Sequence, residues 1–229
     1  MKKNILLIGG SSDIGNSLIK LLDKNKYNIY STFNSNKKRI KNVTNFQTDL
    51  SNIKDIDKLI KNLKGKKIKF DNIIFLQGVI YSLSLSKYTN KKIQDTISIN
   101  TLSVILITKK ILNLLKENSL VVIVSSISGS KGSYDPVYSA SKAALHGFTK
   151  SLSQWLAPKK QFICLCPGPV KATRMFKNFS KKREDFHINQ NPLKSLISAK
   201  EFAKILIDIT KPHWKFANGS IIEINGGIN

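Results

Sequence analysis

The sequence predicts a doubly wound α/β protein with a mostly parallel, seven-stranded sheet and helices on both faces. Short runs of aliphatic and β-branched residues alternate along the chain with longer runs of helical period. The short runs are almost continuously apolar, which is typical of strands covered by helices on both sides. With 229 residues, of which 41% are hydrophobic, the chain can bury one substantial core. We therefore expect one domain over residues 1–229.

The elements follow one another in a regular order. Seven runs are predicted to be strands: 4–8, 27–33, 43–47, 72–77, 120–126, 162–166 and 220–224. Five runs have helical period: 14–24, 53–63, 93–115, 137–156 and 199–210. Residues 173–198 have no clear period, and long loops in compact domains often act as lids, so we predict a substrate lid there.

The composition limits the partners that we expect. The net charge is +24, but the lysines are spread through 24–41, 61–69 and 180–185, and no nucleic-acid-binding motif accompanies them. We interpret these lysines mainly as solvent-exposed side chains on the surface, and we expect no nucleic-acid partner. Because there is no apolar run of about eighteen residues and no cleavage signature, we expect a cytoplasmic protein without a membrane partner. Cys164 and Cys166 are the only cysteines, and we interpret them as reduced packing residues with no metal.

The turn "GGSSDIG" joins the first predicted strand to the first predicted helix. In an open parallel sheet this turn commonly binds a pyrophosphate group through the helix N-terminus. Gly9 permits a tight turn, and Gly15 lets the helix approach the strand. The residues between them, Ser11, Ser12, Asp13 and Ile14, complete the predicted cofactor turn. We expect the Asp13 carboxylate to point away from the pyrophosphate and to interact with the helix dipole and free N–H groups.

The end of the second strand bears on which nicotinamide cofactor the protein binds. No acidic residue stands there to bind the ribose hydroxyls of NAD(H). Asn34 and Ser35 can donate hydrogen bonds, and Lys37, Lys38 and Arg39 bring positive charge to the place of a 2′-phosphate. NADP(H) is therefore favoured, and NAD(H) stays open as the alternative.

The segment "QTDLSN" follows the third strand and contains Asp49 and Leu50. Asp49 could accept a hydrogen bond from an adenine amino group. Alternatively, it could cap the helix that begins near Ile53. The sequence does not decide between these two interpretations.

The segment "VYSASKAALHG" places Tyr138 and Lys142 four residues apart, on one face of a helix. A nearby ammonium group favours the phenolate, so we expect Lys142 to lower the pKa of Tyr138. Ser125 and Ser126 end the fifth strand. One of them could hold a substrate carbonyl while Tyr138 donates a proton and the cofactor delivers hydride.

At this point the sequence resembles the short-chain dehydrogenase/reductase family along nearly its whole length. The matching stretches are the first turn, the pair Asp49 and Leu50, "SIN" at 98–100, "SSISG" at 125–129, "YSASK" at 138–142, "CPGPV" at 166–170 and the C-terminal "NGSIIEINGG". The resemblance implies a Rossmann fold and a compact, NAD(P)-dependent oxidoreductase that interconverts a ketone and a secondary alcohol.

The resemblance also implies a role for each matching residue. Tyr138 would be the general acid in reduction, Lys142 would bind the nicotinamide ribose and tune Tyr138, and Asn100 would hold a water molecule in a proton relay. Ser126 would orient the carbonyl, because it keeps the family spacing to Gly129, although Ser125 stays open. The implied cofactor contacts beyond the first turn are Asn34, Ser35, Asp49, Leu50, Gly78, Tyr138, Lys142, Pro167, Gly168, Val170 and Thr173.

The chain departs from the family pattern at three places. Residues 75–78 read "FLQG" where the family has NNAG, which leaves Gly78 as the matching residue. Ile8 replaces the usual threonine. Ala172 stands at the family's threonine position, with Thr173 one place later. These departures affect the cofactor pocket and leave the catalytic residues in place.

Among compact members, the sequence is most similar to 3-oxoacyl-carrier-protein reductases, which act on β-keto thioesters carried by an acidic protein. Lys177, Lys181, Lys182 and Arg183 of the predicted lid could meet such a carrier, although a solvated loop is the simpler interpretation of this run. The alternatives are a reductase of a small-metabolite or sugar-precursor keto group, or a non-catalytic binding module. The resemblance also implies a homodimer or homotetramer.

Overall fold

The structure is a computed structural model that describes residues 1–35, 42–171, 173–177 and 180–228. Its centre is a seven-stranded sheet with the order β3-β2-β1-β4-β5-β6-β7. The strands are β1 (Lys3–Ile8), β2 (Tyr27–Phe33), β3 (Thr44–Gln47), β4 (Phe70–Phe75), β5 (Leu115–Val124), β6 (Lys160–Pro167) and β7 (Ile221–Ile224). All six strand pairs are parallel. The predicted fold class is confirmed.

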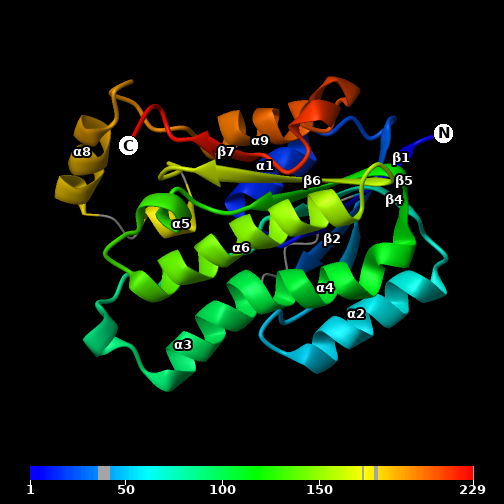
Figure 1. Cartoon of the computed structure of the whole chain (residues 1–229), viewed down its shortest axis with the longest axis horizontal. Helices are drawn as coiled ribbons and strands as arrows, with labels where there is room; N and C mark the ends of the chain where they lie inside the picture. Colours follow the sequence, from blue (N-terminus) through cyan, green and yellow to red (C-terminus); the bar gives the residue numbers. More distant parts are fainter. Residues whose placement is uncertain (36–41, 172, 178–179, 229) are drawn as a thin grey trace.

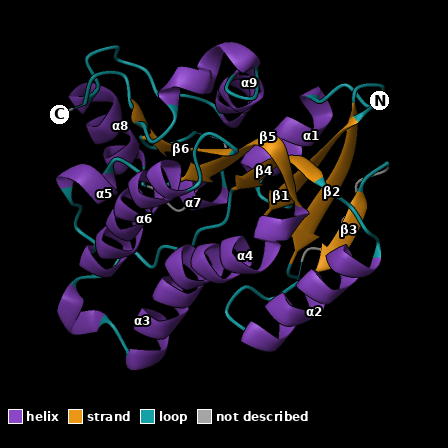
Figure 2. Cartoon of the chain, turned by 45° about the vertical axis from the view of Figure 1, so that its right-hand side comes forward, coloured by secondary structure: helices purple, strands orange, loops and turns teal. Residues whose placement is uncertain are grey.

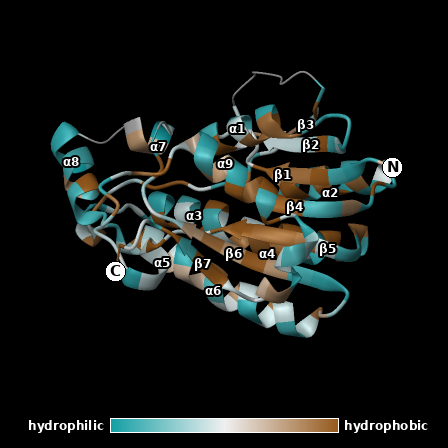
Figure 3. Cartoon of the chain, turned by 90° about the horizontal axis from the view of Figure 1, so that it is seen from above, coloured by the Kyte–Doolittle hydropathy of each residue, from teal (hydrophilic) through white to brown (hydrophobic). Residues whose placement is uncertain are grey.

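Helices cover both faces of this sheet (Figure 1). One face carries α2 (Ile53–Gly65), α3 (Asn90–Ile97), α4 (Ser103–Ile111) and α6 (Pro136–Trp155), and the other carries α1 (Asp13–Leu21) and α9 (Ala199–Asp208). Two separate buried clusters fill the two spaces between sheet and helices. Figure 2 shows the helices flanking the sheet, and in Figure 3 its central strands are predominantly hydrophobic.

Local sequence explains where the main helices begin. Ser12, Asn52 and Asp135 each accept a backbone N–H at the start of α1, α2 and α6, which satisfies donors that a helix N-terminus leaves free. In α9, Ser198 and Glu201 form a reciprocal capping box. The buried face of each helix then packs on strands whose side chains are almost all buried, such as those of β1.

The structure differs from the sequence prediction in the long run 93–115. Instead of one helix, this run contains the end of α3, a π-helical turn over Ser98–Leu102, then α4 and a 3₁₀ turn over Leu112–Leu114. Strand β5 already begins at Leu115, where Leu115 pairs with Phe70 across an irregular register. The polar stretch 116–119 interrupts the apolar pattern, and for that reason the sequence places the strand start too late.

The segment 173–198 is more regular than its sequence indicates. It contains two helices, α7 (Arg174–Lys177) and α8 (Lys181–Gln190). Ser180 caps α8 by accepting the N–H of Arg183 at 3.3 Å, and Lys181 and Asp185 form an i,i+4 ion pair. The helix has only two large apolar residues, Phe186 and Ile188, so hydrophobic periodicity does not indicate it. Its role as a lid stays a prediction.

By length and composition alone, the helical run Asn90–Leu114 could cross a membrane. However, its residues Val104, Ile107 and Ile111 are almost fully buried in the cluster between the sheet and its helices. Over the most apolar stretch of this run, 44% of the residues are buried inside the protein.

Candidate active site

The order of the strands in the sheet reverses between β1 and β4: β2 and β3 lie on one side of β1, and β4 to β7 lie on the other. Ligands of such sheets bind at this switch point, outside the carboxyl ends of the strands. The turn that follows β1 is held in a tight conformation there. Gly9 has a positive φ of 79°, and a Cβ on it would lie 2.9 Å from the backbone N of Gln77. A Cβ on Gly15 would lie 2.4 Å from the carbonyl oxygen of Gly10. Glycine is therefore required at both positions.

The remaining residues of this turn hold its shape. Ser12 caps α1 by accepting the N–H of Gly15 at 3.1 Å, and the carbonyl of Ser11 accepts a hydrogen bond from the side chain of Asn16. Ile14 packs against the core cluster beneath α1. Thr32 of β2, which the sequence interpretation missed, accepts the N–H of Gly9 at 2.8 Å and is buried. The turn thus presents a compact backbone at a helix N-terminus, which fits a dinucleotide pyrophosphate.

Asp13 is the first residue of α1, as predicted. Its carboxylate Oδ2 accepts the backbone N–H of Arg174, the first residue of α7, at 2.7 Å. The sequence predicted an interaction with the helix dipole and with free N–H groups, and the N–H group that the carboxylate contacts belongs to the start of α7 and not to α1. The carboxylate instead connects the cofactor turn to the segment after β6.

The ends of β2 and β3 lie beside this turn in the sheet. Asn34 and Ser35 follow β2 and are exposed, while Lys37, Lys38 and Arg39 lie outside the described residues. Asp49 follows β3 and accepts hydrogen bonds from the N–H and hydroxyl of Ser51, at 2.9 and 2.7 Å.

The capping interpretation of Asp49 is wrong, because Asn52 caps α2 by accepting the N–H of Lys54. The neighbouring Leu50 packs against the core. Contact between Asp49 and an adenine ring remains a prediction.

Three side chains converge at the end of β5 and on the first turns of α6. The Ser126 hydroxyl is near enough to the Tyr138 hydroxyl to lower its pKa, and Ser126 accepts the N–H of Ser128 at 3.1 Å. The Lys142 Nζ lies 5.9 Å from the centre of the Tyr138 ring. All three residues are buried. The serine that faces Tyr138 is thus Ser126.

Ser125 points away from Tyr138, toward the inner side of α6. Its hydroxyl donates to the carbonyl oxygen of Lys142 at 2.9 Å and lies 3.0 Å from His146 Nε2. It is almost fully buried. In this position Ser125 holds α6 against β5.

Burial shifts the pKa values of the two central groups in opposite directions. Burial raises the pKa of Tyr138 to about 12, against a lowering by the hydrogen bond with Ser126. The prediction that Lys142 lowers the pKa of Tyr138 is wrong, because the pKa is raised and Lys142 is not among the groups that shift it. The Nζ of Lys142 donates to the carbonyl oxygens of Val124 and Gln77, at 3.0 and 3.5 Å, and burial lowers its pKa to about 8. Tyr138 is therefore a protonated phenol at neutral pH.

Asn100 and Gly78 lie next to Lys142. Asn100 is fully buried in the π-helical turn, and its side chain donates to Ser141 and pairs with both backbone groups of Val79. A Cβ on Gly78 would lie 3.4 Å from the Lys142 Nζ and 3.9 Å from the Asn100 Oδ1. The side chain of Asn100 thus joins the loop after β4 to α6, and its role in holding water is untested.

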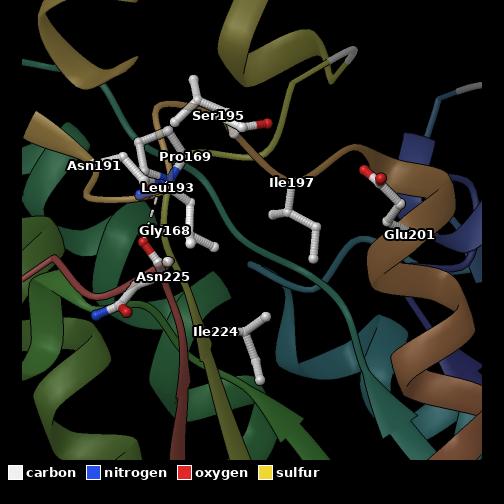
Figure 4. A pocket seen from close by; sticks show the side chains of 11 residues that line it. Gly168, Pro169, Asn191, Leu193, Ser195, Ile197, Glu201, Ile224 and Asn225 are labelled. Carbon is white, nitrogen blue, oxygen red and sulfur yellow. Dashed lines mark hydrogen bonds between the residues drawn. The ribbon is translucent and has the colours of Figure 1, made fainter. Parts of the chain in front are cut away.

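The loop after β6 closes the other side of the site. The carbonyl of Pro167 accepts the N–H of Ile127, and the N–H of Gly168 donates to Ile224 at the end of β7. Val170 is buried, and its carbonyl accepts the Thr173 hydroxyl at 2.8 Å. A cavity of about 310 Å³ lies beside Gly168, lined mainly by residues of the segment 191–197 and of the end of β7 and the loop that follows it (Figure 4). It flanks the site and does not include Tyr138 in its lining.

The sequence interpretation missed a buried carboxylate at the start of α6. Asp135 accepts the N–H of Tyr138 at 2.9 Å, and the Tyr88 hydroxyl lies 2.7 and 2.8 Å from its two oxygens. Asp135 is 2% exposed. The segment "DP" before an apolar helix is a helix-start signal, and it could have indicated the capping role.

The comparison with known families decides which family the chain belongs to. The sequence profile of the short chain dehydrogenase family matches residues 3–184, most of the chain. The chain belongs to the short chain dehydrogenase family. The resemblance stated from the motifs is thus confirmed, and the protein is an oxidoreductase of this family.

Curated members of the family with similar sequences span the same length. A 3-oxoacyl-[acyl-carrier-protein] reductase of Buchnera aphidicola subsp. Schizaphis graminum is 28% identical, covering 99% of this chain and 97% of its own. An acetoacetyl-CoA reductase of Cupriavidus necator is 26% identical over 96% of both chains.

Solved structures of short chain dehydrogenases superimpose closely. A family member from Francisella tularensis has a TM-score of 0.92 at 24% identity, over 100% of this chain and 99% of its own. One from Burkholderia cenocepacia, solved with NADP, has a TM-score of 0.90 at 22% identity, over 99% and 98%. Because both identities are below 25%, these structural similarities establish the fold alone.

Proposed function

We propose that this short chain dehydrogenase reduces a ketone to a secondary alcohol with NADP(H), using Tyr138 as the general acid. The observation that carries the proposal is the convergence of Ser126, Tyr138 and Lys142 at the carboxyl end of β5. Because these groups come from a strand end and a helix, their geometry is preorganised by the fold.

When the enzyme reduces a carbonyl, Tyr138 must start as a protonated phenol. A pKa of about 12 keeps the phenol protonated at neutral pH, so it can donate to the oxygen of a carbonyl that is being reduced. Ser126, which shares a hydrogen bond with Tyr138, is placed to hold the same carbonyl oxygen. Lys142 has two carbonyl partners, and the third N–H of its ammonium group can donate to a ribose hydroxyl.

The cofactor supplies hydride when it is bound. The residues proposed to hold it are the turn Gly9, Ser11, Ser12, Asp13, Ile14 and Gly15, then Asn34, Ser35, Asp49, Leu50, Gly78, Lys142, Pro167, Gly168, Val170 and Thr173. The glycine geometry of the turn supports this assignment, because Gly9 has a positive φ of 79° and a Cβ on Gly15 would clash with the backbone of Gly10. We favour NADP(H) because no acid follows β2 and because a structural neighbour is described with NADP.

We propose a β-ketoacyl thioester as the substrate. The named activities of the two curated relatives support this class. Lys181 and Lys182 of α8 are exposed, which would suit an acidic carrier protein, although Lys181 is paired with Asp185 at 3.0 Å. The second candidate is the keto group of a small metabolite or sugar precursor. It is supported by a Brucella melitensis neighbour whose description includes glucose/ribitol dehydrogenase, with a TM-score of 0.91 at 26% identity.

The experiment is NADPH oxidation with a panel of acetoacetyl-CoA, β-ketoacyl carrier protein, simple ketones and keto sugars, repeated with NADH. Turnover with the thioesters and a preference for NADPH would support the proposal. Turnover with sugars alone would favour the second candidate. Binding of NADPH without turnover on any substrate would favour a non-catalytic module.

We also propose that the chain works as a single domain, as a homodimer or homotetramer, in the cytoplasm. These statements rest on the family resemblance. Sedimentation of the purified protein would measure the number of subunits.

A further inference from the structure

Three metal-binding side chains meet beneath the catalytic helix, outside the group proposed to act on substrate. Cys164 and Cys166 lie two apart on β6 and point to the same face of the sheet. His146 lies on α6, one turn beyond Lys142. Their ligand atoms all lie within 4.8 Å of one another.

The separations fit a small tetrahedral ion. The two sulfur atoms are 3.9 Å apart, and Cys166 Sγ lies 3.2 Å from His146 Nε2. Zinc bonds of about 2.3 Å to sulfur and 2.0–2.1 Å to nitrogen, at tetrahedral angles, require about 3.8 Å between sulfurs and about 3.6 Å between sulfur and nitrogen. Shifts of a few tenths of an ångström would therefore bring these two pairs to zinc geometry.

The surroundings favour a thiophilic ion over a hard one. Both cysteines are fully buried beside the aliphatic Ile127, Ile221 and Ile228. Thr149 and the Lys142 ammonium group also lie close to Cys164, and the ammonium favours its thiolate. A set of two sulfurs and one imidazole is typical of Zn²⁺ and Cu⁺, whereas Mg²⁺ and Ca²⁺ take oxygen ligands.

His146 gives an ion access to the cluster, and its ring is already oriented for ligation. His146 is only partly buried, so it is the side from which an ion can enter. Its Nε2 already faces Cys166 and Ser125, as ligation with the proton on Nδ1 requires. Gly129 makes room for the ring, because a Cβ there would lie 2.9 Å from His146 Cε1.

We propose that His146, Cys164 and Cys166 form a binding site for Zn²⁺, with a fourth position beside the Ser125 hydroxyl. On binding, the two thiols would release their protons to solvent and His146 Nε2 would leave its contact with Ser125. Because Ser125 also donates to the carbonyl of Lys142, the site is coupled to the helix that carries Tyr138 and Lys142. The competing interpretation is a set of thiol and imidazole hydrogen bonds that only packs β6 against α6.

Co²⁺ titration of the reduced, metal-free full-length protein tests the proposal, with absorbance read in the near ultraviolet and visible. Because the chain has only two cysteines, any thiolate-to-cobalt band must come from this pair. We expect one Co²⁺ per chain, a two-thiolate band with tetrahedral visible bands, and displacement by Zn²⁺. We expect Cys164→Ser to halve the thiolate band and His146→Gln to weaken Co²⁺ binding at least tenfold. The matched control His213→Gln, at an exposed histidine, should change neither.

X-ray absorption of the Zn²⁺-loaded wild-type protein makes the test independent of whether variants fold. Two sulfurs at about 2.3 Å and a nitrogen at about 2.0–2.1 Å would support the site. A shell of only oxygen and nitrogen, no thiolate band, or binding that His146→Gln leaves unchanged would overturn it. Neither measurement depends on reductase activity.

Discussion

The carboxylate of Asp13, in the turn after β1, accepts the backbone N–H of Arg174 at 2.7 Å, across 161 residues of sequence. This contact joins the proposed cofactor turn to the start of the segment predicted to be a lid. It gives a physical reason for a carboxylate in a turn that is expected to bind phosphate. The negative charge is directed toward α7 and already has a donor.

Asp13→Gly should loosen the start of α7 while leaving the turn able to bind NADPH. We expect NADPH affinity to stay within about tenfold, which is about 1.4 kcal/mol, because the phosphate contacts of such turns come from backbone N–H groups. Tryptic cleavage after Arg174 should become faster, because the backbone N–H of Arg174 loses its hydrogen bond to the Asp13 carboxylate. Cleavage followed by mass spectrometry measures this, with Asp23→Gly, at a carboxylate outside this contact, as the control. Unchanged cleavage, or a loss of NADPH binding above tenfold, would show that the carboxylate has a different role.

Ser125 and Ser126 should behave in opposite ways when each is replaced by alanine. Ser126→Ala should lower kcat about 10²-fold with little change in stability, because this serine faces Tyr138. Ser125→Ala should lower the free energy of unfolding by about 1–3 kcal/mol, because it leaves the buried Lys142 carbonyl without its hydroxyl donor. Steady-state kinetics and urea unfolding of both variants measure the two effects. The reverse pattern would move the catalytic assignment to Ser125.

The buried Lys142 should make the stability depend on pH in a defined window. Its folded pKa of about 8 lies below the unfolded value of about 10.4, so the unfolded chain binds more protons between these values. The contribution of Lys142 to the free energy of unfolding therefore rises from about pH 8 and is complete above about pH 10.4. Urea unfolding of the wild type and of Lys142→Met at pH 7.5 and 9.5 measures it.

The wild type should gain stability relative to Lys142→Met at the higher pH. Lys150→Met, at an exposed lysine of the same helix, is the matched control and should gain as much stability at the higher pH as the wild type. Equal pH dependence of Lys142→Met and the wild type would mean that burial does not lower the pKa of Lys142.

The hydroxyl of Tyr88 should stabilise the start of α6 through the buried Asp135. Tyr88→Phe removes the hydroxyl that lies 2.7 and 2.8 Å from the two carboxylate oxygens. We expect the free energy of unfolding to fall by about 1–3 kcal/mol, because a buried charge loses a hydrogen-bond donor. Thermal and urea unfolding measure the loss, and Tyr134→Phe, at an exposed tyrosine, is the control. Equal stability of Tyr88→Phe and Tyr134→Phe would exclude this contribution.

Local patterns in the sequence predicted the parts of the protein that local physics decides. Most of the seven strands have an apolar run, and the spacing of Tyr138 and Lys142 places both on one helix face. The tight turn at Gly9 and Gly15 also follows from residue type. These features need no knowledge of distant contacts.

The features that the sequence did not predict depend on tertiary contacts. Which of two adjacent serines faces Tyr138 depends on how β5 sits against α6. The partner of Asp13 is 161 residues away. The net pKa shift of Tyr138 is upward because its burial in the fold outweighs the lowering by Ser126. The grouping of His146 with two cysteines of another element could likewise not be read from spacing.

The central claim is that Tyr138 protonates a carbonyl that receives hydride from NADPH in this site. The most direct measurement uses NADPH deuterated at the transferred position, with acetoacetyl-CoA and the other keto substrates, and mass spectrometry of the product. We predict one deuterium on the carbinol carbon with the wild type. For Tyr138→Phe we predict transfer at least about 10²-fold slower, with NADPH binding retained. Absence of deuterium from every product, or transfer by Tyr138→Phe at the wild-type rate, would contradict the account.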